Sequence, residues 1–200
     1  PRITAASGID ALTHAIECYT GKKANSFCDA LALEAMNLIS GNLRTAVSHG
    51  ADREARNRMA EGALLAGIAF GNSGVAAVHA LAYPLGSHFH VPHGIANGIL
   101  LPHVMQANLA ANPLRYANIA QRLGVKTQGL SQLEAAQQGV AAAKSLIADS
   151  GAPLRLRDLG VPQASLEEMA LATMEISRLL EVNPRQLTLD DVRQIWTDAW

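Results

Sequence analysis

Residues 7–17 read Ser-Gly-Ile-Asp-Ala-Leu-Thr-His-Ala-Ile-Glu, and this short segment already indicates a helical protein. Leu12, Ile16 and Tyr19 are spaced by four and three residues, which places them on one apolar stripe of a helix. The spacing predicts a helix over residues 8–19, closed by a threonine and a glycine.

The same signals continue along the chain. Helix-capping residues, apolar positions three and four apart, and breaks at proline or glycine recur, whereas no segment alternates with period two. We therefore predict further helices over residues 27–48, 52–70, 75–86, 95–109, 113–123, 131–150, 165–180 and from 188 onward, with a turn at 91–94 and a loop with a short turn at 154–161. The sequence predicts one all-α helical bundle domain spanning residues 1–200.

Caps and breaks place the ends of these helices. Capping-box patterns begin at Ser131 and Ser165, each with a glutamate three residues later. Residues 71–74 (Gly-Asn-Ser-Gly) are expected to break a helix, and Pro84 to stop one. Pro102 is expected to kink or divide a third helix.

The composition excludes several classes of protein. Of 200 residues, 49% are hydrophobic and 16% charged, which is enough apolar surface for a core. The net charge is −1 and aromatic residues make up 4%, so neither nucleic acid nor an acidic membrane is an expected partner. No leader or membrane span is expected, and Cys18 and Cys28 are predicted to be reduced, buried thiols of a cytoplasmic protein.

Asp10 and His14 are the first candidates for chemistry. Four residues apart on a helix, their side chains share one face, about 6 Å apart along the axis. A carboxylate and an imidazole so placed can share one cation. The same spacing is also typical of a surface hydrogen bond.

A histidine cluster is the second candidate. Residues 79–97 read His-Ala-Leu-Ala-Tyr-Pro-Leu-Gly-Ser-His-Phe-His-Val-Pro-His-Gly-Ile-Ala-Asn, and they hold four of the seven histidines. His79 lies in an apolar run, where an unpartnered ring would be costly. His93 stands between Pro92 and Gly94, a combination that restricts where its ring points. Either histidine alone also fits a hydrogen-bonded core residue.

Taken together, the two segments predict a metal site. Asp10, His14, His79 and His93 form a set of one carboxylate and three imidazoles, which suits Fe(II) or Zn(II). His88 and His90 flank Phe89 and are interpreted as partly exposed competitors. The two other histidines, at positions 49 and 103, are interpreted as helix-end residues.

Segments 7–17, 79–86 and 92–97 resemble the C-terminal, all-helical, metal-binding half of the iron-containing alcohol dehydrogenase family, within the dehydroquinate-synthase-like superfamily. The resemblance is strong to about residue 110 and collinear to the C-terminus. It implies that the family's metal ligands fall on Asp10, His14, His79 and His93. It also implies a homodimer.

Two departures from the family pattern stand out. Many members carry a second histidine four residues after the first of the cluster, near the nicotinamide and the substrate, and this chain has Tyr83 there. Tyrosine can donate or relay a proton, although its ordinary pKa of about 10 suits a general base near neutrality poorly. Nothing here resembles the family's N-terminal dinucleotide-binding α/β half, because residues 71–74 are too short to be a cofactor loop.

The resemblance implies hydride transfer between a small primary alcohol or its aldehyde and NAD(P), with the metal binding the substrate oxygen. We expect the cofactor-binding residues mostly on the N-terminal dinucleotide-binding domain of the same full-length protein, and this chain alone to be inactive. Alternatives are a polyol dehydrogenase, a dehydroquinate-synthase-like lyase, or a metallohydrolase with Glu17 as base. A metal-free helical interaction module is the last alternative. We interpret Glu17 as a carboxylate beside the ligands or an exposed one.

Overall fold

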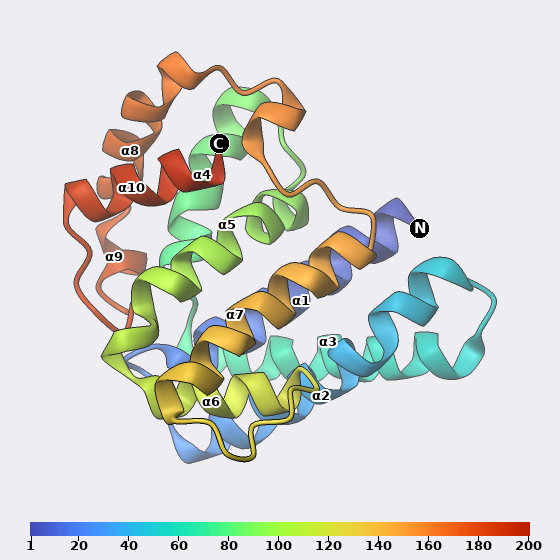
Figure 1. The fold of residues 1–200 in the computed structure, drawn as a ribbon. Coiled ribbons are helices and arrows are strands. Elements are labelled where there is room, and N and C mark those ends of the chain that lie inside the picture. The colour runs from blue at the N-terminus through green and yellow to red at the C-terminus, as the bar shows by residue number, and fades with distance from the viewer.

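The computed structural model describes residues 1–200, and its regular elements are all helices (Figure 1). Ten α-helices follow one another along the chain: α1 (Arg2–Thr20), α2 (Ser26–Ser48), α3 (Arg53–Ser73), α4 (Ala77–Phe89), α5 (His93–Asn108), α6 (Pro113–Arg122), α7 (Gln132–Asp149), α8 (Leu166–Met174), α9 (Ser177–Leu180) and α10 (Leu189–Ala199). Three short 3-10 helices join them, η1 (Leu109–Ala111), η2 (Leu156–Leu159) and η3 (Gln163–Ser165). The predicted all-α class is confirmed.

Helix α1 runs through the middle of the bundle. Helices α2 and α3 pack on each other and on α1, and they lie below it in the view of Figure 1. Helix α5 also packs on α1, and it contacts α4, α7 and α10. Helices α8 and α10 form a group above α5 in the same view. The helices α1, α4 and α5, which carry the candidate residues, therefore meet inside the bundle.

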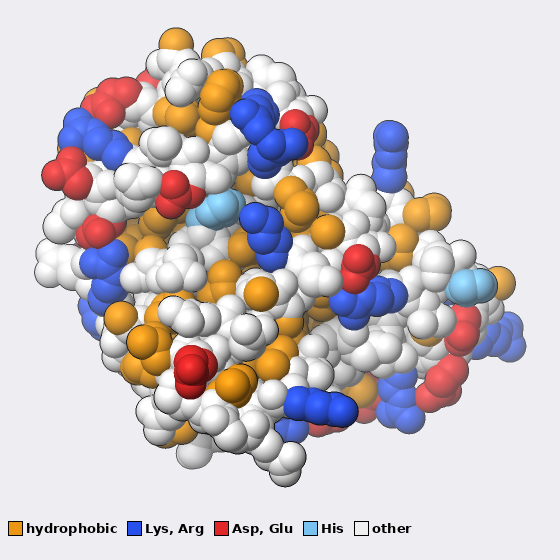
Figure 2. Space-filling model, in the orientation of Figure 1, with side chains coloured by type: hydrophobic (Ala, Val, Ile, Leu, Met, Phe, Trp, Pro, Cys, Tyr) orange, Lys and Arg blue, Asp and Glu red, His pale blue; other side chains and the backbone are white.

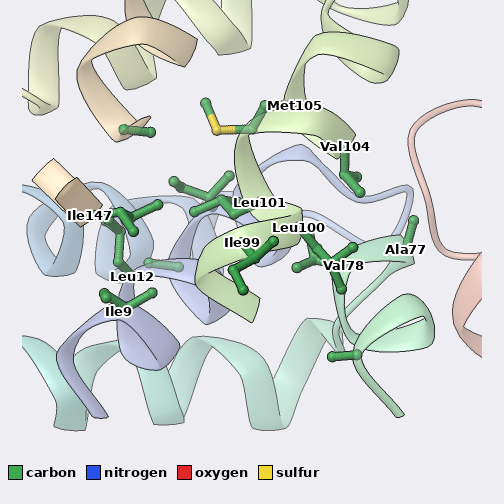
Figure 3. Close-up of a cluster of buried hydrophobic side chains, with 14 of the residues drawn as sticks. Ile9, Leu12, Ala77, Val78, Ile99, Leu100, Leu101, Val104, Met105 and Ile147 are labelled. Atoms are coloured by element: carbon green, nitrogen blue, oxygen red, sulfur yellow. The ribbon is translucent and has the colours of Figure 1, made fainter. Parts of the chain in front are cut away.

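Large aliphatic side chains from these helices fill the core (Figure 3). Ile9 and Leu12 come from α1, Ile99 and Leu100 from α5, and Ile147 from α7, and each is at most 1% exposed. Burial of one such side chain stabilises the fold by about 1.5–3 kcal/mol. The same packing fixes the three site helices relative to one another.

Side chains cap several helix starts, and the predicted capping box at Ser131 is confirmed. The side chains of Asn25 and Asp52 accept backbone hydrogen bonds at the starts of α2 and α3. Ser131 and Thr188 form complete capping boxes at α7 and α10. Helix α1 begins at Arg2, six residues before the predicted start.

Several predicted helix ends are wrong. Residues 71–73 continue α3, which ends at Gly74 in a left-handed conformation with φ 80°. Pro84 lies inside α4, where it is buried and packing outweighs the missing backbone hydrogen bond. Pro102 lies inside α5, which is continuous from His93 to Asn108, so it does not divide that helix.

The predicted helix over residues 165–180 is divided into α8 and α9 at residues 175–176. Ser165 is already in a helical conformation and its hydroxyl donates to the carbonyl of Pro162, so it forms no capping box. His103 lies within α5, not at a helix end, whereas His49 caps α2 at its C-terminal end as predicted.

Figure 2 shows Lys and Arg side chains interspersed with Asp and Glu over the visible face, in keeping with the small net charge. No helix taken singly has the length and apolar character to cross a membrane. Helices α3 and α4 have that length and apolar character only when taken together, and the pair is bent by 103°. Cys18 and Cys28 are buried and unpaired, as predicted, and burial raises the pKa of the Cys18 thiol to about 12.

Candidate metal centre

Three helices bring the four predicted ligands to one place. Helix α1 supplies Asp10 and His14 on one face, α4 supplies His79 in its first turn, and α5 begins with His93. His79 is 2% exposed, whereas the His93 side chain is 43% exposed. The cluster therefore has a buried floor and an open side.

The ligand atoms of Asp10, His14 and His79 all lie within 4.8 Å of one another. His93 is less tightly placed, and it is not a member of that group. Its Nε2 atom lies 3.6 Å from Oδ1 of Asp10, and Nε2 of His79 lies 3.9 Å from the same oxygen. Ligand residues from segments 65 to 83 residues apart in the chain thus converge, as expected from the sequence.

Asn97 is a member of this cluster that the sequence analysis did not single out as a site residue. It is fully buried on α5, one turn after His93. Its Nδ2 atom lies 2.6 Å from Oδ1 of Asp10, 3.3 Å from Nε2 of His79 and 3.2 Å from Nε2 of His93. The amide nitrogen carries two hydrogens, so it donates to Asp10 and can donate to one of the two imidazole nitrogens at a time. The Oδ1 atom of Asn97 is buried without a hydrogen-bond partner.

Glu17 lies behind His79, where it is 3% exposed. Its Oε1 accepts the backbone N–H of Val78 at 2.6 Å, and its Oε2 accepts that of Ala76 at 2.9 Å. The Nδ1 atom of His79 lies 2.6 Å from Oε2. Of the two interpretations of Glu17, a carboxylate beside the ligands and an exposed one, the structure agrees with the first. Both of its oxygens already accept hydrogen bonds.

Aromatic stacking holds the remaining imidazole. The His14 ring lies between Phe70 and His79, with centroids 4.7 Å away on both sides and interplanar angles of 10° and 17°. Burial lowers the pKa of His14, and so does the neighbouring His79 ring, against the opposing effect of Asp10. A lowered pKa favours the neutral imidazole, the form that offers a lone pair.

The open side of the cluster is formed by His93 and Tyr83. Their rings are 6.1 Å apart, and the Tyr83 side chain is among the exposed large residues, at 40%. Burial lowers the pKa of His93 as well, and Asp10 opposes that shift. Tyr83 thus lies at the rim of the cluster and faces solvent.

The other histidines lie outside the cluster. His88 and His90 are exposed, and Nδ1 of His88 faces the Pro84 carbonyl at 3.0 Å. His90 ends α4 in a left-handed conformation. These positions agree with the interpretation of His88 and His90 as partly exposed residues.

Residues 4–200 match the model of the "Fe-containing alcohol dehydrogenase family, C-terminal". The chain belongs to this family.

Relatives within the Fe-containing alcohol dehydrogenase family are similar over nearly the whole chain. It is 45% identical over 198 residues to a 1,3-propanediol dehydrogenase of Citrobacter freundii, a match that covers 99% of this chain and 51% of the relative. It is 39% identical to an NAD-dependent methanol dehydrogenase of Bacillus methanolicus, covering 98% and 51%. A crystal structure of 1,3-propanediol oxidoreductase superposes with a TM-score of 0.96 at 44% identity, covering 98% of this chain and 51% of that one. The chain therefore spans about half the length of these relatives.

Proposed function

We propose that this chain is the metal-binding catalytic half of an NAD(P)-dependent alcohol dehydrogenase or aldehyde reductase. Asp10, His14, His79 and His93 would hold Fe(II) or Zn(II). The observation that carries the proposal is the convergence of the Asp10, His14 and His79 ligand atoms within 4.8 Å of one another. Membership of the Fe-containing alcohol dehydrogenase family supports the same reading.

The residues present fit such an ion. Three imidazoles and one carboxylate are the donor types that Fe(II) and Zn(II) take in proteins. Oδ1 of Asp10 accepts from the amide of Asn97, and the Nε2 atoms of His79 and His93 lie within 3.3 Å of the same nitrogen. Lowered pKa values favour the neutral form of His14 and His93.

Residues at the floor and at the rim of the cluster would have different roles. When bound, the metal supplies Lewis acidity toward the oxygen of an alcohol or aldehyde. The buried ring of His79 and the half-buried ring of His14 would exclude water from the floor. Tyr83 at the exposed rim would exchange a proton with solvent through its phenol oxygen. NAD(P) would bind mainly on a dinucleotide-binding half, in line with the NAD dependence named for one relative.

Two alternatives are less well supported. A metallohydrolase would need Glu17 as a free base, and both of its oxygens accept hydrogen bonds in a buried position. A metal-free interaction module gives no reason for the ligand atoms of Asp10, His14 and His79 to lie within 4.8 Å of one another. A polyol dehydrogenase or a lyase would use the same metal site, so only substrate tests separate them. The homodimer, the cytoplasmic location and the choice of NAD or NADP stay predictions.

Metal analysis tests the first part of the proposal. The chain is purified anaerobically with Fe(II), Zn(II) or Co(II), and its metal content is measured. We expect about one ion per chain, loss of that ion in His79→Ala, and retention in His88→Ala, a matched histidine outside the cluster. Absence of metal from the wild-type chain under these conditions would overturn the proposal.

Turnover tests the second part. The chain is joined to a dinucleotide-binding half, and NAD(P)H oxidation is followed with aldehydes of different size. We expect aldehyde-dependent oxidation, and none from the 200-residue chain alone. Metal-dependent hydrolysis without nucleotide would favour the hydrolase instead.

A further inference from the structure

Glu17 is a buried carboxylate that joins α1 to α4 beside the proposed metal site. It lies seven residues after Asp10 on α1 and is 3% exposed, yet it reaches the first turn of α4. We propose that Glu17 is a positioning residue that fixes the tautomer of His79. In doing so it also ties that ring to the start of α4. This inference rests on the proposed metal site.

The first observation is the missing cap of α4. Its N-cap residue, Ala76, has no side chain that could accept a hydrogen bond, and no acidic residue occupies the first turn. A helix N-terminus without acceptors leaves buried N–H groups unpaired and its positive end uncompensated. The carboxylate of Glu17, from another helix, accepts the N–H groups of Ala76 and Val78. Glu17 therefore serves as the cap that α4 lacks.

The second observation is the proton position on His79. The Oε2 atom of Glu17 is an acceptor, so the Nδ1 atom that faces it at 2.6 Å is the donor. In a neutral ring, the lone pair then lies on Nε2. That nitrogen lies 3.3 Å from the Nδ2 donor of Asn97, a contact that suits an acceptor. Glu17 is therefore the neighbour that specifies the tautomer, and the contact with Asn97 is compatible with it.

The consequence concerns the ligand atom. The Nε2 atom of His79 is the one that faces Asp10, at 3.9 Å. A hydrogen-bonded partner on the other ring nitrogen fixes both the tautomer and the orientation of a metal-binding histidine. The two backbone hydrogen bonds hold the carboxylate in place, so turning the lone pair away from the cluster would break the bond between Nδ1 and Oε2.

Glu17→Gln separates charge from shape. One half of the glutamine amide is a donor, so it faces either the Nδ1 atom of His79 or a backbone N–H of α4. If the NH2 group takes the place of Oε2, Nδ1 must accept, the proton moves to Nε2, and the Ala76 N–H loses its acceptor. If it takes the place of Oε1, only the Val78 N–H loses its acceptor. The first arrangement removes the lone pair from the cluster, and both loosen the helix that carries His79.

The experiment compares Co(II) binding by visible absorption with 15N chemical shifts of the His79 ring in the metal-free chain. We expect the wild-type ring to show a protonated Nδ1 and a bare Nε2, which tests the tautomer without any variant. We expect Glu17→Gln to bind Co(II) about 10–100-fold more weakly and to shift the ring toward the other tautomer. Circular dichroism checks that the variant is folded.

Controls separate a positioning role from simple destabilisation. Thr188→Ala removes the capping hydroxyl of α10, and we expect it to lower the melting temperature while leaving Co(II) affinity unchanged. A wild-type His79 ring protonated on Nε2, or wild-type affinity in a folded Glu17→Gln, would overturn the inference alone. Failure of the wild-type chain to bind Co(II) would instead overturn the proposed function.

Discussion

The side-chain amide of Asn97 donates to Oδ1 of Asp10 across a 2.6 Å contact that joins α5 to α1. The same nitrogen lies within 3.3 Å of the Nε2 atoms of His79 and His93. The two N–H groups of one neutral amide thus occupy the space between atoms that a cation would otherwise bind. The Oδ1 atom of the same amide is buried and has no hydrogen-bond partner, which is unfavourable.

Asn97→Leu should therefore destabilise the metal-free chain. The substitution keeps the approximate volume but leaves the acceptor atoms of Asp10, His79 and His93 without their donor, at a cost of about 1–3 kcal/mol. Urea unfolding in the presence of EDTA measures it. Asn72→Leu, at an exposed site on α3, should change stability by less than about 0.5 kcal/mol. Equal stability of Asn97→Leu and the wild type would show that the amide contributes nothing.

Phe70 should control the protonation of His14. Its ring covers one face of the imidazole, and burial is the main cause of the lowered His14 pKa. Phe70→Ala admits water to that face, so we expect the His14 pKa to rise toward its ordinary value. An NMR titration of the metal-free chain measures the change, with Phe27→Ala, at an exposed position on α2, as the control. An unchanged His14 pKa in Phe70→Ala would contradict this account.

The local signals in the sequence predict the helices well and their interruptions poorly. The caps at Asn25, Asp52, Ser131 and Thr188 act within three residues of themselves, so the sequence signal for each is local. Pro84 is different. Whether it ends a helix depends on the packing around α4, and packing is a property of the whole fold.

The site shows the same division between local and distant information. The spacing of Asp10 and His14 and the apolar surroundings of His79 predict the donor types, because both are local. The position of His93, outside the tight group, depends on how α5 meets α1. The role of Asn97 could have been suspected from its position four residues after His93, but its three acceptors lie on three helices.

Asp191 should give the chain a defined loss of stability in acid. Hydrogen bonds from the Arg185 guanidinium, and from the Thr188 backbone and hydroxyl, hold the Asp191 pKa at about 2, below its usual 3.8. The folded state therefore binds fewer protons than the unfolded state between these values. Stability from this group is present above about pH 4 and is lost as the pH falls toward 2.

Asp191→Asn tests this acid dependence. At neutral pH the variant should be less stable by about 1 kcal/mol, the usual contribution of a cap or a partly exposed ion pair. Below about pH 4 the difference from the wild type should narrow, because the wild-type carboxyl also becomes neutral. Urea unfolding of both proteins from neutral pH down to about pH 2 measures the stability difference at each pH. A constant difference down to pH 2 would contradict the assigned partners.

Gly94 should be the glycine on which the site depends most. A Cβ atom added there would lie 2.0 Å from the backbone oxygen of Ala6, so α5 could not keep its place against α1. We expect Gly94→Ala to cost about 3 kcal/mol, at the upper end for overpacking, and to weaken Co(II) binding by moving His93 away from Asp10. Gly86→Ala is the matched control, because its Cβ meets open space within α4. It should stabilise the chain by about 0.5–1 kcal/mol and leave Co(II) affinity unchanged. Parallel urea unfolding and Co(II) titration of the two variants decide the matter, and similar behaviour of both would show that the contact between α5 and α1 does not position His93.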